Sequence, residues 1–146
     1  CKAFTLIELL VVIVVISVLL TIAIPRIQGM RNEANQVKAK AETRALGAAI
    51  ESYYINQKPP SYPATTANIC STVLNNVAPL IIHEKLYDPY LSTLTEYNYI
   101  RSSNGQHYVV FSVGINGVAN ITGIDDAGTL TGANVDDIYW SNGTGF

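Results

Sequence analysis

A single carboxylate stands inside a long apolar stretch near the start of the chain. Glu8 lies within residues 4–24, and from Leu9 to Ile24 the chain carries no charge. A carboxylate placed in hydrocarbon is costly and usually has a positive partner. No basic residue follows Glu8 until Arg26, about five helical turns further on. We expect a positive group from another copy of the chain to neutralise Glu8; a position at the membrane interface is the alternative.

The histidines do not form a catalytic or metal-binding pattern. His83 and His107 have neither metal-ligand spacing nor a nucleophile motif beside them. Residues 114–117 do not form a phosphate-binding loop, because the Lys and helix that should follow them are missing. An enzyme is therefore not expected. The net charge of −2 offers no basic face, which argues against a nucleic-acid partner.

The apolar stretch has the length of a membrane-spanning helix. A helix rises about 1.5 Å per residue, and the hydrocarbon core of a bilayer is about 30 Å thick. A cleaved signal peptide would be shorter and would end in a small-residue cleavage site. Here the apolar run continues into Pro25 and an amphipathic stretch. We therefore expect a retained helix that runs to about Asn56 and is kinked at Pro25.

Beyond Pro25, apolar residues recur at a spacing of three to four, which predicts one helical stripe. The stripe consists of Ile27, Met30, Ala34, Val37, Ala41, Ala45 and Ala48. Near the helix end it is widened by Leu46, Ala49, Ile50, Tyr53 and Tyr54. A globular domain is expected to pack against that end.

The remaining chain predicts a small β-rich head. Pro59-Pro60 and Pro63 must end the helix. Two β-rich runs, residues 96–101 and 107–114, flank Asn104-Gly105, which is a hairpin signal. The predicted fold class is α+β, a long N-terminal helix with a small antiparallel sheet.

We divide the chain into three parts. Residues 1–25 form the membrane-spanning or filament-core half of the helix, and residues 26–56 form its amphipathic half. Residues 57–146 form the head, with an αβ-loop, a β-sheet and a C-terminal loop.

The start of the helix resembles that of type IV pilins and of the related pseudopilins of type II secretion. The resemblance lies in Phe4-Thr5-Leu6-Ile7-Glu8, the apolar run and Ala23-Ile24-Pro25. In that family a dedicated peptidase cuts just before the Phe and methylates the new amine. The resemblance implies the pilin fold and assembly roles for Phe4, Glu8 and Pro25. It also implies that Glu8 pairs with the N-terminus of a neighbouring subunit in a helical homopolymer.

The head is similar to that of major pseudopilins in three places. These are residues 61–66, Asp88-Pro89-Tyr90, and residues 112–117 together with Asp136-Asp137-Ile138 and Trp140. In those proteins the C-terminal loop binds calcium, and oxygen ligands suit Ca²⁺. Oxygens for such a site could come from Asp125, Asp126, Asn134, Asp136 and Asp137, although the family's individual ligands do not carry over to them. Residues 118–132 depart from the family pattern and Asp and Asn also favour turns, so turn formation is the alternative.

The extreme N-terminus departs from the family, because Ala3 stands where Gly is usual and Cys1 and Lys2 precede it. An N-terminal Cys beside a membrane span is similar to a bacterial lipoprotein, which predicts a lipid on Cys1. An unmodified residue of an atypical leader is the alternative. If the amine is acylated, Lys2 would supply the positive group for Glu8. Cys70 is expected to be a buried thiol, with intermolecular pairing as the alternative.

The sequence predicts a structural subunit of an extracellular filament of the type IV pilus kind. Each copy would wait in the inner membrane, meet the assembly machinery there and polymerise through its apolar helix. The first alternative is a major pseudopilin of a type II secretion system, whose filament is periplasmic. The alternative from another class is a membrane-anchored binding domain that never polymerises. The bound groups that the sequence suggests are Ca²⁺ in the C-terminal loop and a lipid on Cys1.

Overall fold

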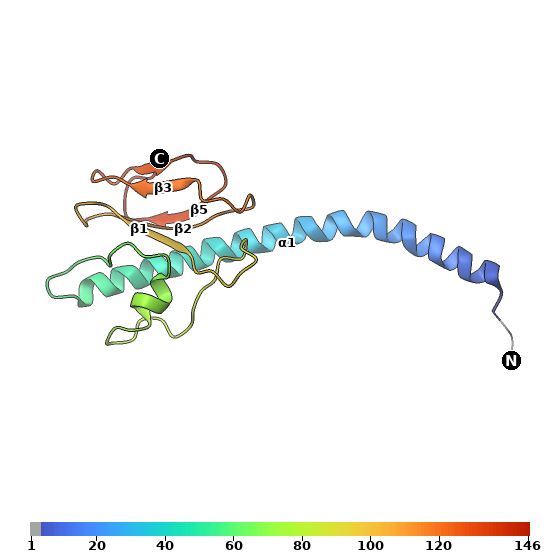
Figure 1. Ribbon diagram of the computed structural model, residues 1–146, viewed down its shortest axis with the longest axis horizontal. Coiled ribbons are helices and arrows are strands. Elements are labelled where there is room, and N and C mark those ends of the chain that lie inside the picture. The colour runs from blue at the N-terminus through green and yellow to red at the C-terminus, as the bar shows by residue number, and fades with distance from the viewer. Residues whose placement is uncertain (1–3) are drawn as a thin grey trace. The chain divides into compact units, whose positions relative to one another are not determined.

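The computed structural model describes residues 4–146. One long helix, α1 (Leu6–Asn56), begins in the apolar run and ends shortly before the prolines that follow it (Figure 1). The expected helix end at Asn56 is therefore confirmed. The chain forms two compact units that divide between Ala34 and Asn35. The three-part division at residues 25 and 56 stays a prediction.

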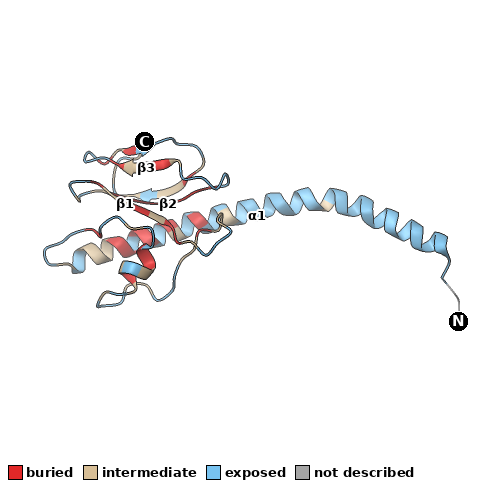
Figure 2. Ribbon diagram, in the orientation of Figure 1, coloured by how far each residue is buried: buried red, intermediate tan, exposed pale blue. Residues whose placement is uncertain are grey.

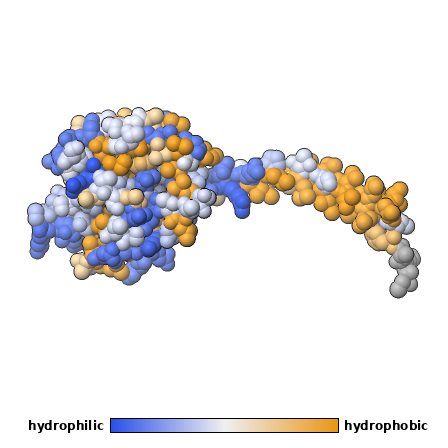
Figure 3. All heavy atoms as spheres, viewed as in Figure 1, coloured by the Kyte–Doolittle hydropathy of each residue, from blue (hydrophilic) through white to orange (hydrophobic). Residues whose placement is uncertain are grey.

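The first unit holds the apolar half of α1, which is long and apolar enough to cross a membrane by length and composition. Its apolar side chains are exposed along the helix (Figures 2 and 3). The two hydroxyls of this stretch bond back to the helix: Ser17 Oγ donates to the Ile13 carbonyl at 2.7 Å, and Thr21 Oγ1 to the Ser17 carbonyl at 2.8 Å. These hydroxyls therefore have acceptors without water, as a hydrocarbon environment requires. The helix continues through Pro25, and the kink stays a prediction.

The second unit adds a small antiparallel sheet to the C-terminal part of α1. Its further elements are a short π-helix η1 (Cys70–Leu74) and the strands β1 (Asn98–Arg101), β2 (Tyr108–Ser112), β3 (Ile121–Ile124), β4 (Leu130–Gly132) and β5 (Ile138–Ser141). Strands β1, β2 and β5 form one antiparallel sheet with β2 at its centre, and β3 and β4 form a separate hairpin. The predicted α+β fold is confirmed.

The hairpin expected at Asn104-Gly105 is present between β1 and β2. The strands pair from Asn98 opposite Phe111 to Arg101 opposite Tyr108. Gly105 adopts a φ of 73°, a left-handed conformation that residues other than glycine seldom take. Asn104-Gly105 therefore lies in the turn of the predicted hairpin, where Gly105 supplies the left-handed conformation.

Strand β2 is buried along its whole length because both of its faces are covered. Tyr108 and Val110 belong to the core that includes Leu46 and Ile50 of α1. Val109 and Phe111 point the other way and pack with side chains of the β3–β4 hairpin. The sheet thus lies between the C-terminal part of α1 and that hairpin (Figure 1).

The face of α1 that packs on the head differs from the predicted stripe. The buried helix residues are Ala39, Thr43, Leu46, Gly47, Ala49 and Ile50. By contrast, Ala34, Val37, Ala41, Ala45 and Ala48 are exposed. Alanine fits a buried or an exposed face equally well, so its spacing does not determine which face packs. The larger Leu46 and Ile50 do determine it, and their predicted burial is confirmed.

Two further core positions explain local sequence choices. A Cβ at Gly47 would overlap the indole of Trp140, so glycine is required for the ring to lie on the helix.

Cys70 is completely buried as a free thiol, as expected, and burial raises its pKa. That thiol is therefore an apolar core group in the folded head.

A buried carboxylate fastens the long loop before β1 to the end of β2. Asp88 is nearly inaccessible, and its two oxygens accept three hydrogen bonds. The donors are Ser112 Oγ at 2.8 Å, the Val113 N–H at 2.9 Å and the Tyr90 N–H at 3.0 Å. The Asp88-Pro89-Tyr90 segment therefore joins the loop before β1 to the end of β2 through the Asp88 carboxylate.

Replacing Asp88 by alanine is expected to lower the free energy of unfolding by about 3 kcal/mol, because buried donors lose their acceptor. The full chain in detergent, unfolded with denaturant and followed by Trp140 fluorescence, measures this change. Asp126→Ala is the matched control, since Asp126 is exposed. A loss below about 1 kcal/mol for Asp88→Ala would contradict the role given to this carboxylate.

Candidate assembly and ion sites

Glu8 closes the first turn of α1 through a reciprocal pair of hydrogen bonds with Thr5. Its Oε2 accepts from the Thr5 N–H at 2.9 Å and from Thr5 Oγ1 at 2.8 Å. The Glu8 N–H in turn donates to Thr5 Oγ1 at 3.3 Å. This arrangement is a capping box, with Thr5 as the N-cap and Glu8 three residues further on. This capping box was not predicted, although a Thr three residues before a Glu at the start of an apolar run signals one.

The capping box leaves half of the Glu8 carboxylate available. Among residues 4–146, Oε1 of Glu8 accepts no hydrogen bond, whereas Oε2 accepts two. The negative charge also lies at the positive end of the helix dipole, which favours it. Residues 4–146 thus satisfy part of the Glu8 carboxylate, and they donate no hydrogen bond to its Oε1.

The other predicted assembly residues are placed only in part. Phe4 is exposed just before α1, and Pro25 lies inside the helix. Cys1 and Lys2 lie outside the described residues, so the positive partner of Glu8 and the lipid stay predictions.

The first pair of predicted calcium ligands forms the turn between β3 and β4. Asp125 Oδ1 accepts from the N–H groups of Ala127 at 2.9 Å and Thr129 at 2.7 Å. Asp126 Oδ1 accepts from the Asn104 N–H at 2.8 Å. Asp125 thus has the hydrogen bonds of a turn-forming residue, whereas Asp126 joins this turn to the turn between β1 and β2.

The second pair of predicted ligands lies at the other end of β3. Asp137 Oδ2 accepts from the N–H groups of Asn120 and Ile121, both at 2.8 Å. Asp136 Oδ2 accepts from the Asn116 N–H at 2.8 Å. Asp137 bonds to the first residue of β3, and Asp125 directly follows its last residue. The four residues of β3 therefore place the two acids about 13 Å apart along the strand. The structure therefore does not bring all the predicted ligands together; Asn134 is exposed in the loop before β5.

The remaining oxygens of the second pair converge on Asn120. With its amide nitrogen turned toward them, Asn120 has Asp136 Oδ1, Asp137 Oδ1 and the Val118 carbonyl at 3.2 Å each, and its two N–H groups can donate to two of these oxygens. Carboxylate and carbonyl oxygens are the ligands that Ca²⁺ takes. If the amide is rotated, its own oxygen joins them, so this donor set fits a calcium ion. Asn120 and Val118 were missed because they belong to the stretch that departs from the family pattern.

Electrostatics at this loop favours a cation. Burial raises the pKa of Asp137, two backbone N–H groups oppose that increase, and the charges of Asp136 and Asp88 add to it. The raised pKa means that ionised Asp137 lowers stability as the pH rises through that pKa. No group of three or more His, Cys, Asp or Glu side chains that could hold a metal ion occurs in the described part of the chain. A cation in this loop would therefore have two carboxylate ligands, Asp136 and Asp137.

The fold and the helix start define a pilin-like protein: an apolar helix that begins with a glutamate capping box and carries a small antiparallel sheet. The model of the prokaryotic N-terminal methylation motif matches residues 1–24. The matched motif supports a resemblance to the superfamily of type IV pilins and pseudopilins.

Comparison with known proteins distinguishes the branches of this superfamily. The type II secretion system core protein G of Klebsiella michiganensis is 28% identical over 136 residues, covering 89% of this chain and 93% of that protein. Its counterpart from Dickeya chrysanthemi is 27% identical over 150 aligned residues, with 99% and 95% coverage. The type IV narrow pilus major component PilA5 of Thermus thermophilus is 47% identical over 48 residues, covering 33% of this chain and 41% of that protein. No solved structure matches the chain.

These comparisons favour the first alternative over the main prediction. The two secretion proteins match nearly the whole chain, whereas the pilus component matches a third of it. The extracellular pilus predicted first is therefore less well supported than a secretion pseudopilin. None of the matched names denotes an enzyme.

Proposed function

We propose that this chain is the major pseudopilin of a type II secretion system, a structural subunit of a periplasmic filament. The similarity to core protein G along nearly the whole chain carries the proposal. The Asp88-Pro89-Tyr90 segment and the segment from Asp136 to Trp140 support it, because both resemble major pseudopilins and both have structural roles in this head.

The geometry of the helix fits storage in a membrane followed by polymerisation. Ser17 and Thr21 are satisfied within the helix, so the apolar half can lie in lipid or among other apolar helices without unmet hydrogen bonds. The exposed face with Ala41, Ala45 and Ala48 leaves small side chains free for close helix contact with neighbouring copies. The inner-membrane assembly machinery would supply the energy for extraction.

Deletion of the chain's gene, with imaging of the cell surface and assay of exported proteins, tests the proposal. Loss of protein export without loss of long surface fibres is expected. Long fibres built from this chain would instead support the pilus. A chain that stays monomeric in detergent and forms no filament under any condition would support the membrane-anchored binding domain.

We also propose that calcium binds between Asp136, Asp137, Asn120 and the Val118 carbonyl. The two loops that carry these groups, residues 113–120 and 133–137, are joined by hydrogen bonds from the Asn116, Asn120 and Ile121 N–H groups to the two acids and by one from the Ala133 N–H to the Asn120 carbonyl at 3.1 Å. A bound cation would offset the repulsion between the acids and fix both loops.

Chelation of calcium is expected to lower the melting temperature of the full chain in detergent by at least about 5 °C, because a ligand that binds only the folded state stabilises it. Scanning calorimetry with calcium and with chelator measures the shift. Asp137→Asn should remove the shift, and Asp125→Asn, in the separate turn, should preserve it. An unchanged melting temperature in chelator would reject the ion and leave the acids as loop formers.

The N-terminal proposals have a direct test in the intact mass of the purified subunit. A mass equal to residues 4–146 plus one methyl group rejects retention of Cys1. A gain of several hundred daltons confined to the N-terminal peptide supports the lipid, in which case Lys2 is the proposed partner of Glu8.

A further inference from the structure

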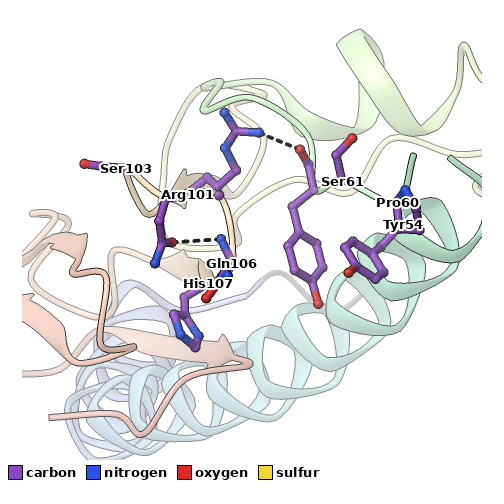
Figure 4. A pocket seen from close by; sticks show the side chains of 10 residues that line it. Tyr54, Pro60, Ser61, Arg101, Ser103, Gln106 and His107 are labelled. Carbon is purple, nitrogen blue, oxygen red and sulfur yellow. Dashed lines mark hydrogen bonds between the residues drawn. The ribbon is translucent and has the colours of Figure 1, made fainter. Parts of the chain in front are cut away.

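The head contains a polar pocket that neither the helix nor the ion site uses. Its volume is about 630 Å³, and it lies between the end of α1, the loop that follows it and the β1–β2 turn (Figure 4). We call it the Arg101 pocket; the residues that line it include Tyr54, Ser61, Tyr62, Arg101, Ser103 and Gln106.

The cation of this pocket is held in place but has no anionic partner. Arg101 Nη1 donates to the Tyr62 carbonyl at 2.8 Å, which fixes the guanidinium at the pocket wall (Figure 4). The ion pair formed within residues 4–146 is Lys38–Glu42, so no carboxylate of the described chain neutralises Arg101. A guanidinium has five N–H donors in a planar fork that matches a carboxylate. The protein thus presents a fixed carboxylate receptor.

The β1–β2 turn keeps one side of that receptor uncovered. A Cβ at Gly105 would lie 3.8 Å from Arg101 Cζ and Nη1, so a longer side chain there would lie against the guanidinium. Around it, the side chains of Ser61, Ser103 and Gln106 form no hydrogen bond within the described chain, and all are exposed. Several neutral hydrogen-bonding groups therefore surround one cation.

The opposite wall is aromatic. Tyr54 stacks on Tyr62 with the ring centroids 4.4 Å apart and the planes inclined by 26°. Tyr62 is fixed from behind by Tyr108, at a centroid distance of 4.9 Å. Tyr54 is only partly buried, so it offers apolar surface to a ligand. Rigid aromatic surface beside a few converging polar groups is the usual composition of a small-ligand site.

An extended peptide is a poorer match, because the sheet edge beside the pocket is already occupied. Thr66 pairs with Tyr99 of β1 as an isolated bridge, and the Arg101 N–H donates to Thr65 Oγ1 at 3.0 Å. A peptide could therefore not add to β1 as a further strand. The ligand must be recognised through its own functional groups.

We propose that the Arg101 pocket binds an acidic sugar, a pyranose that carries a carboxylate. The carboxylate pairs with the Arg101 guanidinium, the ring packs on Tyr54, and the hydroxyls bond to Ser61, Ser103 and Gln106. The proposal is independent of the secretion function, since any filament subunit or anchored domain could carry this site.

Isothermal titration calorimetry, with trigalacturonate added to the full chain in detergent, tests the proposal. Saturable binding is expected, and Arg101→Gln should weaken it at least about 10-fold, because a bidentate charge-assisted pair is lost. Lys58→Gln removes the same charge from an exposed position outside the pocket and should leave binding unchanged.

A second pair of variants keeps the test decisive if Arg101→Gln fails to fold. Ser103→Glu places a carboxylate at the pocket rim and should abolish binding, whereas Ser103→Gln should retain it. Absence of saturable binding by the wild-type chain, or equal binding by both Ser103 variants, overturns the proposal. Equal binding of triglutamate overturns the assignment to sugars, and weaker binding of triglutamate than of trigalacturonate supports it.

Discussion

Replacement of Glu8 by alanine is expected to reduce filament yield at least about 10-fold while the chain still inserts into the membrane. Oε1 of Glu8 accepts no hydrogen bond within the described chain, so it is free for a positive group of a neighbouring copy. Loss of an attraction worth about 1.4 kcal/mol corresponds to tenfold in an equilibrium constant, and a charge pair in hydrocarbon exceeds that. Quantification of sheared filaments, with membrane fractionation of the same cells, measures both effects.

A variant of Thr5 separates the two roles of Glu8. Glu8→Ala also removes the capping box, which by itself is worth about 1 kcal/mol of helix stability. Thr5→Ala breaks the same box but keeps the carboxylate. We expect Thr5→Ala to form more filament than Glu8→Ala does. Equal yields would assign the effect to the helix start, and normal filament yield from Glu8→Ala would make Glu8 an interfacial charge.

The long helix and the hairpin could be predicted because their signals are local. The apolar run sets the start of α1, Pro59-Pro60 sets its end, and Asn104-Gly105 sets the turn between β1 and β2. The prolines and the Asn-Gly pair restrict or permit backbone conformations of their own and adjacent residues, and the apolar run avoids water through its own side chains. No distant part of the chain has to be placed first.

The packing face of α1 and the oxygen cluster could not be predicted in the same way. The spacing of the alanines predicts a helix face but does not show which face is buried. In the structure the sheet packs on the face that carries Leu46 and Ile50. The convergence of Asn120 with Asp136 and Asp137 depends on how the loops before β3 and before β5 meet. Asp125 and Asp126 were therefore predicted to bind the same ion as Asp136 and Asp137, although the structure places the two pairs at opposite ends of β3.

The head also contains a set of tyrosine hydroxyls that donate to acceptors in or beside the core. Tyr97 donates to Glu42 Oε2 at 2.6 Å. Tyr62 and Tyr108 both donate to Glu51, each with a contact of 3.0 Å. Tyr99 donates to the Pro63 carbonyl at 3.0 Å. Each of these hydrogen bonds requires a protonated hydroxyl, and loss of the proton from those facing Glu42 or Glu51 would set two negative charges against each other.

Burial is the main reason why these tyrosines resist ionisation in the folded head. It raises the pKa of Tyr62 to about 12, and the Glu51 carboxylate adds to that increase. Burial also raises the pKa values of Tyr97, Tyr99 and Tyr108 far above the usual value for tyrosine. The unfolded chain would release these protons near pH 10.

The head is therefore expected to unfold between about pH 10 and pH 12. A pKa raised in the folded state gives stability that is complete below the unfolded pKa and is lost as the pH rises above it. Circular dichroism of the full chain in detergent should show the loss of the sheet, with tyrosine absorbance at 295 nm rising in the same transition. Glu51→Gln removes the charge that opposes ionisation of Tyr62 and Tyr108, so stability should fall less steeply with pH in that variant. Tyrosines that all titrate near pH 10 while the sheet stays intact would contradict the buried hydrogen bonds on which this expectation depends.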